Sequence, residues 1–158
     1  CTALHHQKRV LHCSTSSTQC WPYPSRNNAA LRRSGRIETW YDVDLVAGSE
    51  WDKKIIEELE RADIVMLLLS PNFMATDYIW NVEIPKAVKE GKTIVPIFLR
   101  PCDWYIDPID QDSKEAKLKI QEKSALPLKE DWIVQNSKPN RDEGYLAVVN
   151  GIKKLLDQ

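Results

Sequence analysis

Glu83 is the residue of this sequence whose type and position best fit chemistry. It lies in a segment, roughly Asp77 to Lys89, whose apolar residues recur at helical spacing. Glu83 follows Ile79 by four residues and Trp80 by three, so a helix turns its carboxylate towards the side of these apolar residues. A carboxylate in such a place is either paired and structural or held partly dry for chemistry. The sequence leaves both interpretations open.

The elements around this segment position it. Six apolar residues, Ile64 to Leu69, precede it and end at a Ser-Pro-Asn turn. Such a run is typical of a strand buried on both faces, as in a parallel sheet. Gly91 ends the expected helix, and Thr93 to Leu99 forms a second buried strand. Pro85 removes the donor for the carbonyl of Asn81, so it either kinks the helix near Glu83 or restarts it.

Further elements alternate in the same way along the chain. Ser49 is expected to begin a helix whose Ile55, Leu59 and Ala62 share one face. A closing helix is expected to bury Leu146 among its core residues. The other expected elements are a short strand at 37–41, a short helix at 113–120, an edge strand at 132–134, and the closing helix itself at 141–156.

Strands separated by single helices predict an α/β fold. We expect a flavodoxin-like three-layer sandwich, with a parallel sheet of about five strands and helices on both faces. Ligands of such sheets bind beyond the carboxyl ends of the strands. Three segments are expected to converge there, namely Asp42–Gly48, Ser70–Phe73 and Arg100–Trp104.

Residues 1–30 do not follow this pattern. Pro22 and Pro24 fall where the first helix is expected, and a proline inside a helix costs about 3 kcal/mol. A weak first strand near 10–14 is the only candidate for the central strand. We therefore divide the chain into an atypical segment, 1–30, and one domain, 31–158.

Composition excludes several classes of function. The chain has 158 residues, with 22 Lys and Arg against 23 Asp and Glu, so no net charge draws it to nucleic acid or to an anionic membrane. No apolar run is long enough to span a bilayer, and the first residues show no signal-peptide pattern, so neither feature is expected. Its four cysteines form no C-x-x-C pair, which favours a reducing, cytoplasmic location. His5, His6 and His12 lack the spacing of a zinc site, so no metal is expected.

Four motifs follow one another between residues 37 and 158. They are WYDVDLVAGSEW at 40–51; ADI to SPNF at 62–73, continued by DY at 77–78 and EIP at 83–85; VPIFLRPCDW at 95–104; and ALP at 125–127 with DEGY at 142–145. In this order they resemble the second strand and loop, the third strand and helix, the fourth strand and loop, and the late segment of Toll/interleukin-1 receptor (TIR) domains of bacterial type.

The N-terminal strand departs from that family. Its members open with a Phe-Ile-Ser-Tyr-like strand, whereas this chain has Val10-Leu11-His12-Cys13-Ser14. One hypothesis is that residues up to about 28 are translated from a shifted reading frame that rejoins the family sequence near Ala29. Sequencing of the coding DNA tests it.

The resemblance implies an activity in signalling or defence. Enzymatic TIR domains cleave the nicotinamide–ribose bond of NAD, and Glu83 matches their catalytic glutamate. Glycoside hydrolysis usually needs an acid for the leaving oxygen in addition to a base or nucleophile. The nicotinamide of NAD is already cationic and leaves as a neutral base, so one carboxylate that stabilises charge on the ribose suffices. NAD is thus the expected substrate, and no cofactor is expected.

Other residues are candidates for substrate binding, each beside a structural role. Trp51, Phe73 and Trp80 offer flat surfaces for nicotinamide or adenine, or pack in the core. Arg100 can meet a phosphate, or pair with Asp103.

The remaining candidates are polar. Asp42 and Asp44 flank the loop that in the family gates access and makes domain contacts, or they serve turn and cap chemistry. Ser70 is a further candidate, which can instead bond the backbone at the turn after its strand.

Other classes fit less well. A receiver domain needs a phosphoacceptor Asp where Ser70 stands, and the five isolated glycines form no phosphate-binding loop. A flavodoxin would need a glycine-containing phosphate loop after its first strand, where Ser14 to Thr18 stand. The alternative that remains is a non-catalytic scaffold, in which TIR domains pair with one another and signal by assembly. Both interpretations predict other TIR domains as partners.

Overall fold

The computed structural model describes residues 7–13, 28–41, 49–103 and 141–157, and within them a parallel sheet forms the centre. Its strand order is β2-β1-β3-β4, which is the flavodoxin-like arrangement expected from the sequence. The strands are β1 (Lys8–Cys13), β2 (Ile37–Tyr41), β3 (Ile64–Leu69) and β4 (Thr93–Phe98). The edge strand expected at 132–134 and the helix expected at 113–120 lie outside the described residues.

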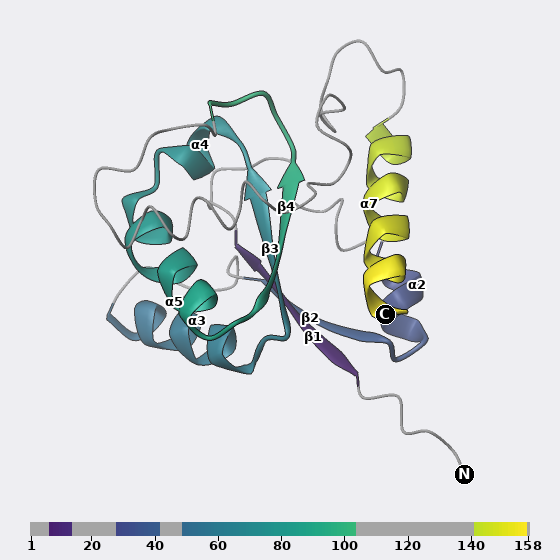
Figure 1. The fold of residues 1–158 in the computed structure, drawn as a ribbon, viewed down its shortest axis with the longest axis horizontal. Helices are drawn as coiled ribbons and strands as arrows, with labels where there is room; N and C mark the ends of the chain where they lie inside the picture. Colours follow the sequence, from purple (N-terminus) through teal and green to yellow (C-terminus); the bar gives the residue numbers. More distant parts are fainter. Residues whose placement is uncertain (1–6, 14–27, 42–48, 104–140, 158) are drawn as a thin grey trace.

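Helices cover both faces of this sheet (Figure 1). One face carries α3 (Ser49–Arg61), α4 (Pro71–Met74) and α5 (Ile84–Lys89), and the other carries α2 (Ala29–Arg33) and α7 (Arg141–Leu156). The predicted α/β sandwich is therefore confirmed. Within the described parts of the chain, no helix is long and apolar enough to cross a membrane.

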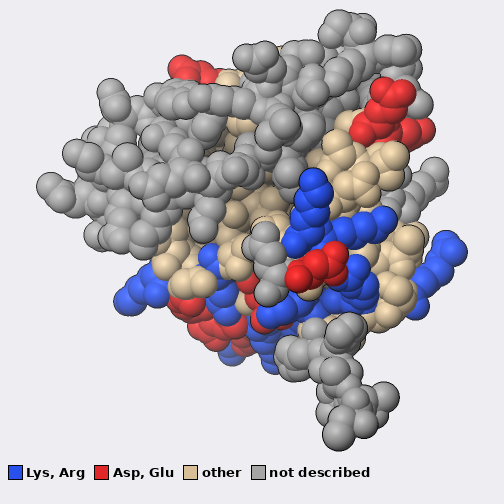
Figure 2. All heavy atoms as spheres, turned by 45° about the vertical axis from the view of Figure 1, so that its right-hand side comes forward, with Lys and Arg blue, Asp and Glu red and all other residues tan. Residues whose placement is uncertain are grey.

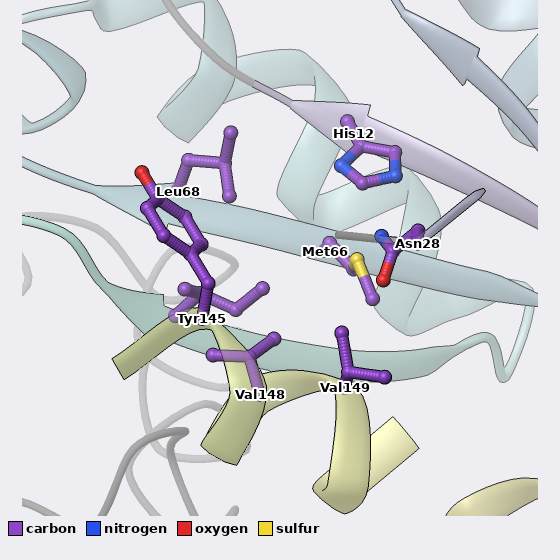
Figure 3. Close-up of a pocket in the computed structure, with 8 residues that line it drawn as sticks. His12, Asn28, Met66, Leu68, Tyr145, Val148 and Val149 are labelled. Atoms are coloured by element: carbon purple, nitrogen blue, oxygen red, sulfur yellow. The ribbon is translucent and has the colours of Figure 1, made fainter. Parts of the chain in front are cut away.

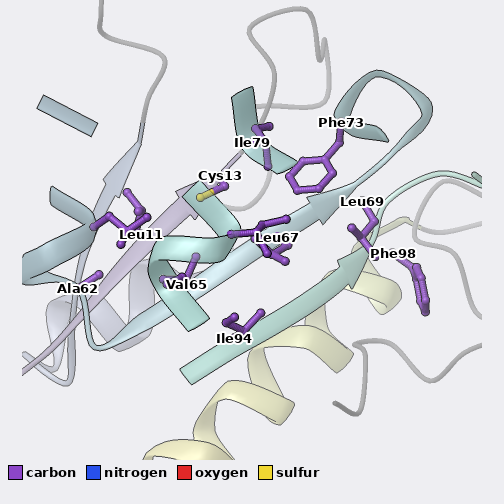
Figure 4. Packing of buried hydrophobic residues seen from close by; sticks show 13 residues of the cluster. Leu11, Cys13, Ala62, Val65, Leu67, Leu69, Phe73, Ile79, Ile94 and Phe98 are labelled. Carbon is purple, nitrogen blue, oxygen red and sulfur yellow. The ribbon is translucent and has the colours of Figure 1, made fainter. Parts of the chain in front are cut away.

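Strand β3 shows why both faces need a cover. All six of its residues are buried, and they alternate between two apolar clusters. Val65, Leu67 and Leu69 point into the cluster under α3, α4 and α5, where Figure 4 shows them among Phe73 and Ile79. Ile64, Met66 and Leu68 point into the cluster under α2 and α7, which also contains Leu31, Val149 and Ile152. The sheet is thus the middle layer of a two-sided core.

The unusual N-terminal sequence provides the central strand. Strand β1 pairs in parallel with β2 on one side and with β3 on the other. Its start is fixed by Asp63, whose carboxylate accepts a 2.8 Å bond from the backbone N–H of Arg9. Val10, Leu11, His12 and Cys13 are all buried, with His12 only 1% exposed. The strand expected near 10–14 thus lies at Lys8–Cys13.

Two glycines end helices, and for Gly91 the sequence predicted this role. Gly91 has φ +66°, and the N–H groups of Gly91 and Lys92 donate to the carbonyls of Val88 and Ala87. Gly35 has φ +69° and closes α2 by the same pair of bonds. This conformation is strained for a residue with a Cβ, which is why glycine follows each helix.

One core prediction for α7 is wrong. Leu146 was expected in the core but is 56% exposed. The helix instead buries the preceding residue, Tyr145, together with Val148, Val149 and Ile152, of which Val149 and Ile152 were expected in the core. Because neighbouring residues on an α-helix lie about 100° apart around the axis, the burial of Tyr145 turns Leu146 out to solvent.

Candidate functional site

The helix that carries Glu83 contains a wide turn. The segment 77–89 is helical as predicted, but residues Ile79–Glu83 form a π-helical turn, η2. The N–H of Ile84 donates to the carbonyl of Ile79, five residues earlier. The α-helix then restarts at Ile84 with Pro85 in its first turn, where a proline is tolerated. Pro85 was expected either to kink the helix or to restart it, and in the structure the α-helix restarts. π-turns of this kind occur frequently at functional sites.

The wide turn ends at Glu83, whose side chain is buried. Glu83 is 4% exposed, and Ile79 and Ile84 on either side of it belong to the apolar cluster under α3, α4 and α5. The sequence predicted that this carboxylate shares the side of Ile79, and it does. A carboxylate so far from bulk water is costly to leave charged without compensation, which separates Glu83 from ordinary surface glutamates.

Two carboxylates, those of Asp52 and Glu83, act on Tyr78, the residue that precedes this turn. Burial raises the pKa of the Tyr78 phenol, and the negative charges of Asp52 and Glu83 raise this pKa further. Asp52 lies in the first turn of α3 and is exposed. The start of α3 and the helix of Glu83 therefore face one another closely enough for their charges to interact.

Ser70 and Phe73 form the turn that leads from β3 towards this helix. The Oγ atom of Ser70 accepts a 3.2 Å bond from the backbone N–H of Phe73 and so caps α4. Ser70 and Phe73 are both completely buried. The structural roles foreseen for these residues are therefore present, and a contact of either with a substrate stays a prediction.

Trp80 links the wide turn to α4. Its ring meets that of Phe73 edge to face, with centroids 6.0 Å apart and planes at 79°. Trp80 is partly buried and packs against the same apolar cluster. Part of the Trp80 side chain is therefore accessible to solvent, whereas Phe73 is completely buried.

The carboxyl ends of β3 and β4 are joined by their backbones. The N–H groups of Leu99 and Arg100 both donate to the carbonyl of Leu69, over 3.0 and 3.3 Å. The side chain of Arg100 is exposed at this edge. Cys102 follows, partly buried against the apolar cluster, and burial together with Asp103 raises the pKa of its thiol to about 11. The structure thus brings the 70–73 and 100–103 segments to one edge, as expected.

The third expected segment is not described. Asp42 and Asp44 lie outside the described residues, as does the side chain of Trp51, whose backbone belongs to α3. Gly48 ends the undescribed stretch next to Ser49, the first residue of α3, so the loop leads directly into the helix that carries Asp52.

The opposite face of the sheet holds a small cavity. His12, Asn28, Met66, Tyr145, Val148 and their neighbours enclose it beneath α7, as Figure 3 shows. Its volume of about 10 Å³ is at the lower limit for one water molecule, far below what a nucleotide needs. Burial lowers the pKa of His12 to about 3, so this imidazole is neutral in the folded protein at physiological pH. The cavity belongs to the core.

A wider hollow of about 390 Å³ opens at the amino edge of the sheet, among Gln7, Arg9, Glu38, Arg61 and Asp63. Its two arginines have acidic partners: Arg9 lies 3.2 Å from Glu38, and Arg61 lies 3.3 Å from Glu58. Because these charges are compensated, and because ligands of parallel sheets bind at the other edge, this hollow is not the candidate site.

Comparison with known proteins decides the family. The family model described as TIR domain matches residues 26–126, which is more than half of the chain. This chain belongs to the TIR domain family. It is 33% identical over 128 residues to the uncharacterized protein y4lF of Sinorhizobium fredii (strain NBRC 101917 / NGR234). That stretch is 78% of this chain but 36% of the relative, so the chain spans about a third of that longer protein.

A solved structure agrees on the fold. The chain superposes on the RPS4 and RRS1 TIR domain heterodimer with a TM-score of 0.56, covering 97% of this chain and 100% of the other. At 16% identity this likeness concerns the fold alone. In this TIR domain the sequence analysis missed Tyr78, on which the charge of Glu83 acts, and Asp52, whose charge also acts on Tyr78. The signal for Tyr78 was present, because the pair Asp77-Tyr78 was part of the resemblance, but helical periodicity gave no reason to place it near Glu83.

Proposed function

We propose that this TIR domain, when self-associated, hydrolyses the nicotinamide–ribose bond of NAD with Glu83 as the catalytic carboxylate. The observation that carries the proposal is the burial of Glu83, which is 4% exposed at the end of a π-turn. A surface glutamate in that position would have removed the basis for it. Membership of the TIR family adds support, since the glutamate occurs at the matching place of the motif.

The proposed reaction needs few groups. The bond between the ribose C1′ and the nicotinamide nitrogen breaks, and its electron pair leaves with the nitrogen, which becomes neutral. Positive charge develops on the ribose, where the carboxylate of Glu83 stabilises it. A water oxygen then bonds to C1′ and releases a proton. The products are nicotinamide and ADP-ribose, and the leaving group needs no acid.

The neighbouring residues have supporting roles in this proposal. The partly accessible ring of Trp80 offers a surface on which a base can stack. Arg100, exposed at the carboxyl edge, is suited to a pyrophosphate oxygen. Asp42, Asp44 and Trp51 are proposed to contact the substrate on the basis of the resemblance to TIR domains alone. Ser70 and Phe73 hold the turn beneath it.

Glu83→Gln tests the proposal most directly, because it removes the charge and keeps the shape. We expect nicotinamide release by Glu83→Gln to fall roughly 100-fold or more below that of the unchanged chain. Glu57→Gln is the matched control, since Glu57 is an exposed glutamate of α3. Chromatography of nicotinamide measures both. Equal release from the unchanged chain and from Glu83→Gln would remove Glu83 as the catalyst.

Self-association has its own test. In an isolated domain one face of the bound ribose would remain open to water, so the rate per protomer is expected to rise with protein concentration. Measurement of specific activity over a dilution series checks this. A rate per protomer that does not depend on concentration would contradict the requirement for assembly.

A second candidate function is a scaffold that acts only by TIR–TIR contact. The exposed side of α7 favours it, because Leu146 is a large apolar residue that is 56% exposed. The helix begins with Asp142 and Glu143 and ends with Lys153 and Lys154. Figure 2 shows acidic side chains at the top of this face and Lys and Arg side chains gathered lower down. Two antiparallel copies of α7 would therefore bring opposite charges together.

Charge-reversal variants test whether α7 forms the contact surface between two copies of the chain. Glu143→Lys and Lys154→Glu are each expected to weaken self-association in sedimentation experiments, and the double variant is expected to restore it. Glu57→Lys on α3 is the control. If the unchanged chain self-associates but releases no nicotinamide at high concentration, the scaffold is the function that remains.

A further inference from the structure

Tyr78 and Glu83 are five residues apart, a spacing that normally separates two side chains. In an α-helix of 3.6 residues per turn, residues five apart lie about 140° from one another around the axis. The turn between these two is not α-helical, because Ile84 bonds to Ile79 across five residues. An i→i+5 turn holds one more residue, so a side chain five positions on returns near to the side of the first. The π-turn thus brings Tyr78 and Glu83 to neighbouring sides of one helix.

The phenol oxygen of Tyr78 is enclosed by the protein. Its oxygen has less than 1 Å² of accessible surface, although the residue as a whole is only partly buried. Two carboxylates act on it electrostatically, Asp52 from the start of α3 and Glu83 from the π-turn. A buried hydroxyl next to two negative charges is retained as the neutral phenol, which is the form able to donate a hydrogen.

We propose that Tyr78 is the positioning residue of Glu83, held next to its carboxylate by the π-turn. The O–H dipole of the neutral phenol would fix one side of the Glu83 carboxylate and leave the other side for the ribose. Because Asp52 is on a different helix, the same phenol would also separate two negative charges that repel each other. The role in catalysis rests on the proposed function, but the coupling of Tyr78 to Glu83 does not.

The coupling can be measured without any enzymatic activity. Tyrosine labelled with ¹³C at Cζ gives one NMR signal for each residue, and Tyr78→Phe identifies the signal of Tyr78. We expect Tyr78 to titrate above the ordinary tyrosine pKa of 10.0, because burial, Asp52 and Glu83 all raise its pKa. Glu83→Gln should lower this pKa, and Glu57→Gln should not. An identical titration of Tyr78 in the unchanged chain and in Glu83→Gln would overturn the proposal.

Kinetics then test the positioning role. Tyr78→Phe removes only the hydroxyl, and we expect kcat for nicotinamide release to fall about tenfold while KM changes little. Trp80→Phe is the comparison, because loss of a surface on which the substrate stacks should raise KM instead of lowering kcat. Full kcat in Tyr78→Phe overturns the positioning role even where NAD is hydrolysed. Absence of hydrolysis in the unchanged chain, together with coupled titration, would refute the proposed function and leave the pairing intact.

Discussion

The two faces of the sheet bury their ionisable groups in opposite ways. On the α2 and α7 face, His12 lies among apolar side chains, and burial alone lowers its pKa to about 3. On the α3, α4 and α5 face, Glu83 lies in a wide turn, and its charge acts together with that of Asp52 on the phenol of Tyr78. Burial keeps His12 neutral, so this residue contributes to packing. Glu83 is buried but interacts with another ionisable group, and such carboxylates are candidates for chemistry. The contrast points to the side of the molecule where function is to be sought.

The largest structural effect is expected on the Glu83 face, from Phe73→Ala. Phe73 is completely buried, joins α4 to β3 and meets the ring of Trp80 edge to face. Its loss should lower the free energy of unfolding by about 3–5 kcal/mol, because a large cavity remains. Urea denaturation measures this value. Met74→Ala, next in the chain and only partly buried, should cost clearly less. An equal cost for both variants would mean that the aromatic pair does not hold this face together.

His12 should make the opposite face sensitive to acid. Its pKa is about 3 in the folded chain against an ordinary value of 6.5, so above pH 6.5 it is neutral in both states and has no effect. Between these values only the unfolded chain binds the proton, and stability falls as the pH falls. From pH 7 to pH 5 the loss should be about 2 kcal/mol. Denaturation of the unchanged chain and of His12→Leu at both pH values checks this, and an equal loss in the two would place the acid sensitivity elsewhere.

Ser70→Ala should have a moderate effect on the Glu83 face. The Oγ atom of Ser70 caps α4 through its 3.2 Å bond from the N–H of Phe73. Loss of such a cap lowers the free energy of unfolding by about 1 kcal/mol. Ser70→Asp would keep a capping oxygen but bury a charge, so Ser70→Thr is the better control. A Ser70→Ala variant as stable as the unchanged chain would show that the cap is dispensable and free the hydroxyl for another role.

The smallest change in stability is expected from Lys86→Met. The Nζ atom of Lys86 lies 2.7 Å from Glu60 and 3.0 Å from Glu90, and so joins α5 to α3 at the surface. Exposed ion pairs contribute little, and salt screens them. The free energy of unfolding of the variant, measured by urea denaturation, should be only slightly lower than that of the unchanged chain at low salt and equal to it at high salt. A large loss of stability that persists in high salt would show that this pair, rather than the apolar cluster, fixes the helix of Glu83.

Sequence reasoning succeeded where a pattern was long or complete. The run Ile64–Leu69 is a strand with the expected bounds, because a six-residue apolar run that ends at a Ser-Pro-Asn turn is too short for a typical buried helix and favours a buried strand. Gly91 marked a helix end because glycine readily adopts the positive φ that this position requires. The burial of Glu83 followed from its distance to Ile79, a spacing that survived the wide turn between them.

Sequence reasoning failed where one residue changes the phase of a helix. Periodicity predicts a helix over 77–89 whether or not it contains an extra residue, so the π-turn and the approach of Tyr78 to Glu83 were not visible. Leu146 was misplaced for a related reason, since an offset of one residue separates the buried stripe of α7 from the exposed one. His12 was expected in the weak first strand and was considered as a metal ligand, but its burial was not foreseen, because burial on a central strand depends on the strands and helices around it.

The thiol of Cys102 has a practical consequence for ligand discovery. With a pKa of about 11, only roughly one molecule in ten thousand carries the reactive thiolate at pH 7. Acrylamides and other electrophilic warheads should therefore label this cysteine slowly, even though it lies next to the carboxyl edge of β4. Inhibitors for this edge should rely on reversible contacts, and alkylating reagents can be used on other cysteines with little interference from this one.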